Sequence, residues 1–442
     1  MSEEKKLGVL WLGHSDYLDE NTANIQREIH GTLSQIPHVA SELSPLACTD
    51  EDAVAAARKL MQKGCCGAVI VLTTWVECNI VMSAWKEMRG LPCLFWGFPV
   101  EEVCGIREST GAYVSASMFA GVIRRVGARC PVLYGSFRDE KTLHDIAVFA
   151  SAAACAGTLT YSRMGLIGYT SMSIYTGTFD HVLMRYLVGP EVEQMDTYSL
   201  LREAEQTTPE ELAEARKKLS ALTSLRSDAE PYLDKTLAMY TAMKKLCQSH
   251  NWSAVNVKCQ YELSKEYKAV PCVALSLLAE DGITASCEGD TPCTVSMMML
   301  RELTGQTVWY GDSLTHRGNT VQFSPCGFLP FSLALGKTQV GQFMDHPGFK
   351  GIQVCGVLRP EKVTFLRLVE DIGSYHLLYG TGTGVETQPR DGTMPALNVL
   401  LDGSTEALCR EYAGQHFALC YGDYSAELEA LGSIMGIETR RV

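Results

Sequence analysis

Short apolar runs alternate with stretches of helical spacing along the first third of the chain. The runs that predict buried strands are Leu7–Leu12, Ala68–Leu72, Leu91–Trp96 and Pro131–Tyr134. The stretches that predict helices are Asp50–Lys63, Asn79–Met88, Met118–Val126 and Asp139–Cys155. Strands that alternate with helices in this way form a parallel sheet covered by helices. We therefore expect a doubly wound, Rossmann-like α/β domain over residues 1–162. No GxGxxG follows its first strand, so the dinucleotide fingerprint is absent.

A second doubly wound α/β domain is expected over residues 163–305. Its predicted strands are Met164–Tyr169, Ser253–Lys258 and Ile283–Ser286. Between the first two lies the most charged part of the chain, residues 196–250, where Thr208 and Glu211 form a capping box ahead of an amphipathic helix. We interpret this charged part as a solvated helical hairpin over the sheet.

The pattern changes after Gly305. Short strands separated by glycine-rich turns are predicted at Gly356–Leu358, Lys362–Glu370, Tyr375–Gly380, Ala396–Leu401 and His416–Tyr421. Lys362–Glu370 alternates between apolar and polar residues, which is typical of a half-buried strand. We expect residues 306–442 to form a β-rich C-terminal domain, built as an antiparallel barrel or sandwich.

Two acidic residues stand out at the junction of the second and third predicted domains. Glu288 lies in the Cys-Glu-Gly-Asp stretch that follows the strand Ile283–Ser286. A helix is predicted next, with Thr291 as its N-cap and Gly305 at its C-terminal end. A second apolar run then ends at Asp312, 24 residues after Glu288. Both acids thus follow predicted strands, and α/β proteins place ligands at the carboxyl ends of strands.

Three interpretations of this pair stay open. The acids are exposed loop residues, ligands of a divalent metal ion, or an acid/base pair for proton transfer. The second and third are compatible, because a metal-bound carboxylate can also move protons. His416 alone would be an ordinary packed or exposed side chain, but with Glu288 and Asp312 it completes a set suited to Mn²⁺, with Mg²⁺ or Co²⁺ as alternatives.

Composition narrows the class of protein. The chain has 442 residues, 46% hydrophobic and 20% charged, which is typical of a globular protein. A net charge of −13 without a basic stripe argues against nucleic-acid binding. No apolar run reaches about 18 residues, and the N-terminus lacks the layout of a signal peptide, so we expect no membrane association. The seventeen cysteines indicate buried thiols in a reducing cytoplasm. Because no CxxC pair is present, a zinc ribbon, an iron–sulfur cluster and a thiol redox protein are weak alternatives.

Three motifs resemble those of a known family. They are VKCQYEL at Val257–Leu263, ASCEGD at Ala285–Asp290, and the Gly-Asp pair that ends at Asp312. With the late strand that carries His416, they make the chain similar to the L-fucose isomerase and L-arabinose isomerase superfamily. It is closest to the shorter, L-fucose-isomerase-related branch, and the resemblance covers nearly the whole chain. It implies metal ligation by Glu288, Asp312 and His416. Ser324–Gly327 stands where related proteins have a histidine, which favours the three-ligand site of L-fucose isomerases.

The resemblance also implies an activity. It implies a metal-dependent aldose–ketose isomerase that works through a cis-enediol, with Glu288 and Asp312 as the acid/base pair. The implied substrate is of the L-fucose or D-arabinose type, or a C6-modified hexose such as sulfoquinovose, whose anionic end group His316, Arg317 or Lys258 could meet. The alternative is a non-catalytic sugar-binding or sensing protein on the same fold.

Substrate contacts are expected from polar and aromatic residues near strand ends, namely Lys258, Gln260, His14, Trp11, Trp75 and Tyr421. Glu77 and Tyr424 are further candidates, and the tryptophans could instead be core residues. In the family, the first domain of a neighbouring subunit closes the site. A homo-trimer or homo-hexamer with sites at subunit interfaces is therefore expected.

Overall fold

The computed structural model describes residues 5–40, 42–342 and 350–442. The chain divides into two compact units. The first comprises Met1–Thr158 and Ala426–Gly436, and the second comprises Leu159–Ser425 and Ile437–Val442. The predicted second and third domains thus lie together in the second unit. Residues 426–436 return to the first unit, which the sequence did not predict. There, helix α13 (Ser425–Met435) contributes Ile434 to the packing.

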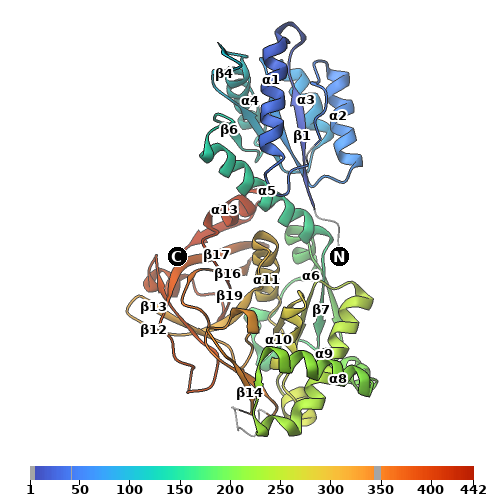
Figure 1. Ribbon diagram of the computed structural model, residues 1–442, viewed down its shortest axis with the longest axis vertical. Coiled ribbons are helices and arrows are strands. Elements are labelled where there is room, and N and C mark those ends of the chain that lie inside the picture. Colours follow the sequence, from blue (N-terminus) through green and yellow to red (C-terminus); the bar gives the residue numbers. More distant parts are fainter. Residues whose placement is uncertain (1–4, 41, 343–349) are drawn as a thin grey trace. The chain divides into compact units, whose positions relative to one another are not determined.

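A four-stranded parallel sheet forms the centre of the first unit (Figure 1). Its order is β1 (Leu7–Leu12), β2 (Gly67–Leu72), β3 (Cys93–Gly97) and β6 (Val132–Tyr134). The helices that connect or follow these strands are α1 (Glu20–Leu33), α2 (Asp50–Gln62), α3 (Cys78–Glu87), α4 (Ala112–Val126) and α5 (Glu140–Tyr161). A small hairpin joins β4 (Glu101–Val103) to β5 (Ile106–Glu108).

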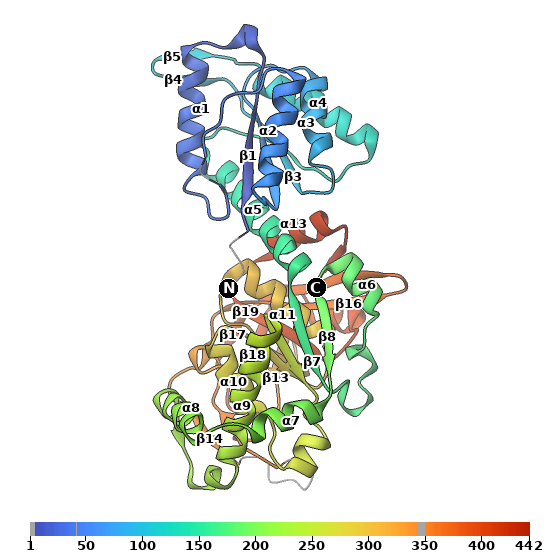
Figure 2. The same ribbon diagram turned by 90° about the vertical axis from the view of Figure 1, so that its right-hand side faces the viewer.

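Both faces of this sheet are covered, because successive residues of a strand point to opposite sides. In β1, Val9 and Trp11 belong to a core cluster with side chains of α1 and α5. Leu10 and Leu12 belong to another cluster with side chains of α2, α3 and α4. Figure 2 shows α1 on one side of β1 and α2 and α3 on the other. This is the doubly wound arrangement that the alternating pattern predicts.

Helix α5 is long and apolar enough to cross a membrane by length and composition alone. More than half of its most apolar window is buried inside the protein, and its side chains Ile146 and Phe149 belong to the core of the first unit. A buried core helix passes the same test as a membrane span, so the finding is weak support for a membrane span.

The second unit begins with another four-stranded parallel sheet, in the order β11 (Thr284–Cys287), β10 (Ala254–Val257), β7 (Arg163–Ile167) and β8 (Glu191–Met195). Five longer helices accompany it: α7 (Thr197–Glu205), α8 (Pro209–Leu222), α9 (Glu230–His250), α10 (Cys272–Glu280) and α11 (Thr291–Thr304). Two short π-helical segments, Met184–Val188 and Glu262–Tyr267, and the single turn α6 (His181–Leu183) occupy its loops.

The remaining strands form an antiparallel barrel. Six of them pair in a closed ring in the order β16 (Lys362–Asp371), β19 (His416–Tyr421), β12 (Trp309–Arg317), β13 (Thr320–Ser324), β18 (Leu397–Leu401) and β17 (Ser374–Val385). Strand β20 (Glu438–Arg441) adds to β17 in parallel, and helix α12 (Thr405–Glu411) lies between β18 and β19 in the chain. A three-stranded sheet combines β15 (Gln353–Cys355), β14 (Gln339–Gly341) and β9 (Ser224–Leu225).

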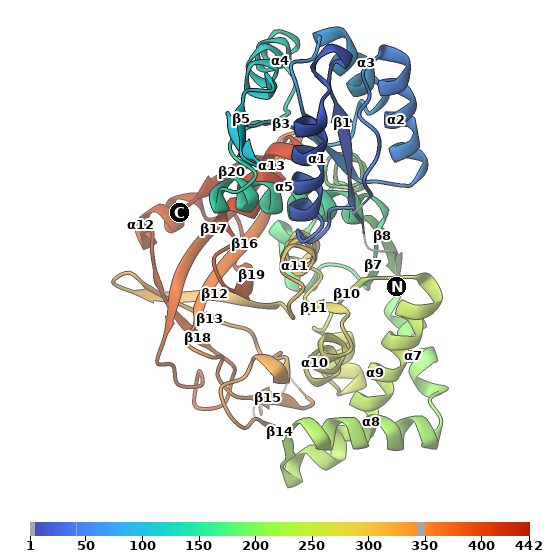
Figure 3. The same ribbon diagram turned by 45° about the horizontal axis from the view of Figure 1, so that its top comes forward.

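Helix α11 packs against both parts of the second unit. It contacts β10 and β11 of the parallel sheet and β16 and β19 of the barrel. Figure 3 shows it between these two groups of strands. The Ser296 hydroxyl of α11 accepts a hydrogen bond of 2.7 Å from the Leu368 amide of β16. The stretch that leads into this helix therefore lies where the sheet and the barrel meet.

Two details of the sequence prediction are wrong. Helix α11 is capped by Asp290, whose carboxylate accepts a hydrogen bond from the Cys293 amide, whereas Thr291 is the first helical residue. Asp312 does not follow a strand of the parallel sheet, because β12 continues to Arg317 and belongs to the barrel. Of the two acids, only Glu288 follows the carboxyl end of a parallel strand.

Candidate metal and acid–base site

Glu288 occupies a sharp turn between β11 and α11. Its φ is +69°, an unusual conformation for a residue with a side chain, and Gly289 follows at +72°. A Cβ at Gly289 would lie 2.2 Å from the Tyr169 carbonyl oxygen, so only glycine fits there. The buried amide of Asn256 in β10 holds the turn, since it accepts from the Gly289 amide and donates to the Asp290 carbonyl. This turn directs the Glu288 carboxylate towards the barrel.

Asp312 and His416 meet because of strand register. Strands β12 and β19 are antiparallel neighbours, and Asp312 lies directly opposite His416. Side chains at opposite positions of neighbouring strands are close enough to interact. His416 is 104 residues away in the chain, so only the closing of the barrel brings the pair together.

The three predicted ligands converge on one atom. Nε2 of His416 lies 3.3 Å from Oε2 of Glu288 and 3.4 Å from Oδ1 of Asp312. Glu288 and His416 are buried, whereas 23% of the Asp312 side chain is exposed. The carboxylates of Glu288 and Asp312 therefore both lie next to Nε2 of His416, and Asp312 is the more accessible of the two.

A buried ion pair between Asp290 and Arg367 holds His416 at the Nδ1 side of its ring. The sequence did not predict this ion pair. Oδ2 of Asp290 lies 2.9 Å from Nδ1 of His416 and accepts a hydrogen bond of 2.9 Å from Nη1 of Arg367. Arg367 also donates to the carbonyl oxygens of His416 and Thr176. The Asp290 and Arg367 side chains are each 1% exposed. Asp290 could have been found from the sequence, because it is the last residue of the ASCEGD motif at Ala285–Asp290.

The charges of this network shift several pKa values. Burial raises the pKa of Asp290, but the charge of Arg367 and the bond to His416 outweigh burial and lower it to about 2. Burial lowers the pKa of His416, but the hydrogen bond to Asp290 and the nearby negative charges of Glu288 and Asp290 raise it to about 10. Burial is also the main reason that the pKa of Asp312 is raised, and the charge of Glu288 adds to it. Because Asp290 is ionised, Nδ1 of His416 must be the hydrogen-bond donor.

The site fits a divalent metal ion by two observations. Two carboxylate oxygens and one imidazole nitrogen form a donor set suited to Mn²⁺. Nε2 of His416 is buried and makes no hydrogen bond to any described residue, although both carboxylates lie near it. A metal ion that binds Nε2 would displace its proton, and an Nδ1 that donates to a carboxylate is the usual arrangement of ligating histidines.

Two of the predicted substrate contacts lie on the same sheet edge as Glu288. Lys258 directly follows β10, the neighbour of β11, and forms an ion pair of 2.9 Å with Glu262. Gln260 is buried, and its side-chain oxygen accepts from the Ser264 hydroxyl at 3.4 Å. Both residues thus have partners within their own loop, and their roles stay predictions.

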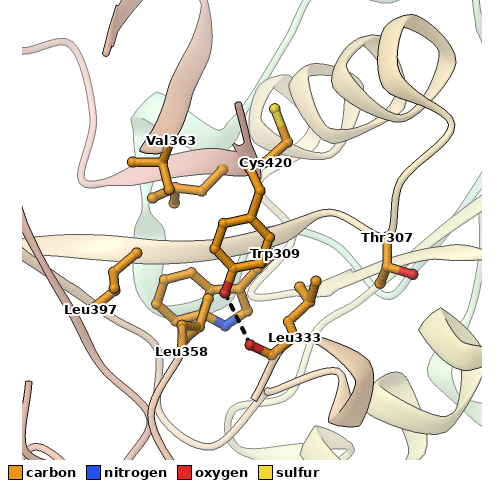
Figure 4. Close-up of a pocket in the computed structure, with 9 residues that line it drawn as sticks. Thr307, Trp309, Leu333, Leu358, Val363, Leu397 and Cys420 are labelled. Carbon is orange, nitrogen blue, oxygen red and sulfur yellow. Dashed lines mark hydrogen bonds between the residues drawn. The ribbon is translucent and has the colours of Figure 1, made fainter. Parts of the chain in front are cut away.

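Tyr421 belongs to the interior of the barrel. Its hydroxyl donates to the Leu333 carbonyl at 2.9 Å and accepts from the Arg359 amide at 3.0 Å. It lines a small, mainly apolar cavity of about 10 Å³ with Trp309, Leu358 and Val363 (Figure 4). A cavity of this size is at the limit for a single water molecule, so it cannot admit a sugar. Tyr424, the further candidate three residues after Tyr421, accepts a hydrogen bond from the Gln306 side chain.

The predicted contacts of the first domain lie in the first unit. The ring centroids of His14 and Trp75 lie 5.5 Å apart in an edge contact, and the ring of Tyr17 contacts both of them. These residues follow the carboxyl ends of β1 and β2, and Glu77 at the start of α3 is exposed. Trp11 is fully buried among the core residues of this unit, which favours the interpretation of Trp11 as a core residue.

Of the predicted cations, His316 and Arg317 lie on the exposed end of the β12–β13 hairpin. Sequence reasoning missed Arg390, whose positive charge acts on Asp312 and lowers its pKa against the effect of burial. Arg390 donates to the Pro325 carbonyl at 3.3 Å, and its buried Nε hydrogen-bonds to nothing in the described ranges. Arg390 is therefore a cation whose charge reaches Asp312, and its Nε also lies 3.9 Å from Oδ2 of Asp391.

Comparisons with known proteins find several sugar isomerases. The chain is 28% identical to the sulfoquinovose isomerase of Priestia megaterium over 79% of each chain. It is 27% identical to that of Clostridium sp. (strain MSTE9), over 84% of this chain and 86% of the relative. The sulfoquinovose isomerase of Alkalicoccus urumqiensis is 23% identical over 82% and 83%. No protein-family model matches the chain.

Among solved structures, a periplasmic solute-binding protein of Actinobacillus succinogenes 130z with bound D-allose covers 68% of this chain and 93% of its own. The TM-score of 0.18 and the identity of 10% are too low for that likeness to carry an argument.

The likeness to the isomerases identifies the protein as an enzyme, an intramolecular oxidoreductase of the aldose–ketose isomerase class. The alternative of a non-catalytic sugar-binding protein is not favoured. The particular proteins that it resembles are sulfoquinovose isomerases.

Proposed function

We propose that the protein interconverts an aldose and a ketose through a cis-enediol, with Glu288 and Asp312 as the acid/base pair. The reaction moves a proton between two adjacent carbons, so one group must remove a proton and one must return it. The observation that carries this proposal is that both carboxylates lie within 3.4 Å of Nε2 of His416. The raised pKa of Asp312 makes its carboxyl group a better proton carrier near neutral pH.

We further propose that Glu288, Asp312 and His416 hold Mn²⁺, with Mg²⁺ or Co²⁺ as alternatives. When bound, such an ion acts as a Lewis acid towards the substrate oxygens and orients the substrate. Asp290 and Arg367 fix the imidazole so that Nε2 points at both carboxylates. This arrangement favours membership of the L-fucose and L-arabinose isomerase superfamily. We expect the protein in the cytoplasm.

For the substrate, we propose a hexose with an anionic group at C6, of which sulfoquinovose is the example suggested by the relatives. The support within the chain is Arg390, a guanidinium that lies close enough to Asp312 to lower its pKa. A guanidinium is well matched to oxyanions, because it donates several hydrogen bonds in one plane. L-Fucose or D-arabinose remains the alternative, as a neutral sugar would need no such cation.

We also propose a homo-oligomer, a trimer or hexamer, with sites at subunit interfaces. The segment that lies against the Glu288 turn exposes several large aromatic side chains: Tyr169, Tyr175 and Tyr186 are 50%, 82% and 83% exposed. The Ser171 amide in this segment donates to the Glu288 carbonyl, so the segment belongs to the rim of the site. Exposed apolar surface of this kind is typical of an interaction site.

An activity screen tests the substrate proposal. The protein with Mn²⁺ is incubated with sulfoquinovose, glucose, L-fucose and D-arabinose, and ketose formation is measured. Sulfoquinovose should be the preferred substrate. Arg390→Met should lower kcat/KM for sulfoquinovose by about tenfold or more, as expected for loss of a charged hydrogen bond, without a matching loss for neutral sugars. Turnover of L-fucose or D-arabinose alone would contradict the C6 proposal, and turnover of no aldose would contradict the reaction itself.

A further inference from the structure

A second group of potential metal ligands lies beside Glu288. The side chains of Cys259 and Cys287 are buried with it, and one ligand atom from each of the three lies within 4.8 Å of the others. Cys259 follows β10, whereas Cys287 is the last residue of β11. Because these strands are parallel neighbours, their carboxyl ends bring the two thiols to the same edge of the sheet.

Two further donors surround this group. The Tyr310 hydroxyl of β12 lies 2.7 Å from Sγ of Cys287. Sγ of Cys326, from the segment after β13, lies 4.0 Å from Oε1 of Glu288. Donors from four separate segments thus converge on one buried region. In a tetrahedral zinc site, ligands lie about 2.0–2.3 Å from the ion, so they are roughly 3.3–3.8 Å from each other. The ligand atoms of Cys259, Cys287 and Glu288 lie within 4.8 Å of one another, so small side-chain movements would bring them to that spacing.

We propose that Cys259, Cys287 and Glu288 form a binding site for a thiophilic divalent ion such as Zn²⁺ or Cd²⁺. Thiolates select soft ions, whereas carboxylates and imidazole suit Mn²⁺, so the two neighbouring donor sets differ in the ion they take. Each thiol releases its proton to solvent when the ion binds. Cys326, whose Sγ lies 4.0 Å from Oε1 of Glu288, is a candidate for a fourth ligand.

The site shares Glu288 with the proposed catalytic set, and this part rests on the proposed function. An ion held by the two thiols would draw the Glu288 carboxylate away from His416 and Asp312. Zn²⁺ or Cd²⁺ should therefore inhibit the isomerase even when Mn²⁺ is present. The thiol site would act as a sensor of thiophilic metals that switches the enzyme off.

The test uses the metal-free full-length protein and Cd²⁺ as the probe. Cadmium thiolates absorb in the ultraviolet through charge transfer from sulfur, so the signal does not depend on activity. Wild type should show this absorption with about one Cd²⁺ per chain. Cys259→Ala and Cys287→Ala should lose it, whereas Cys247→Ala should keep it. Cys247 is a matched control, because the three side chains are 4%, 5% and 3% exposed and Cys247 lies in α9.

Serine variants at the same positions keep the side-chain volume and serve if an alanine variant fails to fold. Asp312→Asn separates the two proposals, since it removes an acid of the isomerase without touching the thiol site, and its Cd²⁺ absorption should persist. In the active enzyme, Cys259→Ala should raise the Zn²⁺ concentration for half-inhibition about tenfold or more. Cadmium–thiolate absorption that survives both cysteine substitutions, or that is absent from wild type, would overturn the thiol site.

Discussion

The buried Asp290 offers the sharpest test of how the chain prepares His416. In Asp290→Asn the side chain keeps its shape and can still cap α11, because asparagine is as good an N-cap as aspartate. The substitution removes the charge that receives the hydrogen bonds from Nδ1 of His416 and Nη1 of Arg367. Loss of such a supporting carboxylate typically weakens metal binding about 10- to 100-fold. We expect a weakening of that size for Mn²⁺.

The same substitution leaves the Arg367 guanidinium buried without its partner. Removing one side of a buried ion pair costs about 3–5 kcal/mol, so the variant should unfold at a lower temperature. Adding Arg367→Met removes the uncompensated charge and should restore much of the stability. It should not restore Mn²⁺ affinity, because His416 still lacks its carboxylate. This difference separates a role in positioning the ligand from a role in folding.

Mn²⁺ affinity is measured by titration of the metal-free protein, with the electron spin resonance of free Mn²⁺ as the readout and thermal unfolding as the check of folding. Asp196→Asn is the matched control, since Asp196 caps α7 through the Tyr198 amide and is exposed. It should bind Mn²⁺ like wild type. An Asp290→Asn protein that is folded and binds Mn²⁺ as tightly as wild type would refute the positioning role.

Four other outcomes are expected. Glu288→Gln and Asp312→Asn should each lower turnover by about 10²-fold or more, and near-normal isomerisation in both would exclude them as proton carriers. The purified protein should hold about one Mn²⁺ per chain and lose activity on chelation, as metal analysis before and after dialysis will show. Light scattering should show a trimer or hexamer, and an active monomer would contradict this. The pKa of Asp290 is lowered from 3.8 to about 2, so its contribution to stability is present above 3.8 and is lost as pH falls through about 2. Acid titration of wild type should therefore show a loss of roughly 2 kcal/mol in that range that Asp290→Asn lacks.

Much of the framework was visible in the sequence. The strands Leu7–Leu12 and His416–Tyr421 have the bounds predicted for them, because uninterrupted apolar runs report burial on both faces. Helix α2 begins at Asp50 as expected, with Thr49 as its cap, and Gly305 ends α11 in the left-handed conformation. Local chemistry fixes these features, so a reader of the sequence can find them. Gly289 is also a local signal of the sharp turn, because its φ of +72° favours glycine, although the contact with the Tyr169 carbonyl is made by tertiary packing.

The site itself depends on long-range packing. Asp312 and His416 face each other only because the barrel closes with one particular register between β12 and β19. Asp290 looked like the last residue of a turn, yet it forms a buried ion pair with Arg367, 77 residues away. Cys259 and Cys287 are unrelated by any CxxC spacing, and the parallel pairing of β10 and β11 brings them together. The sequence by itself determines the elements and the residue types available for chemistry. Only the tertiary structure decides which of them meet, because pairing and burial join residues whose separation along the chain carries no signal.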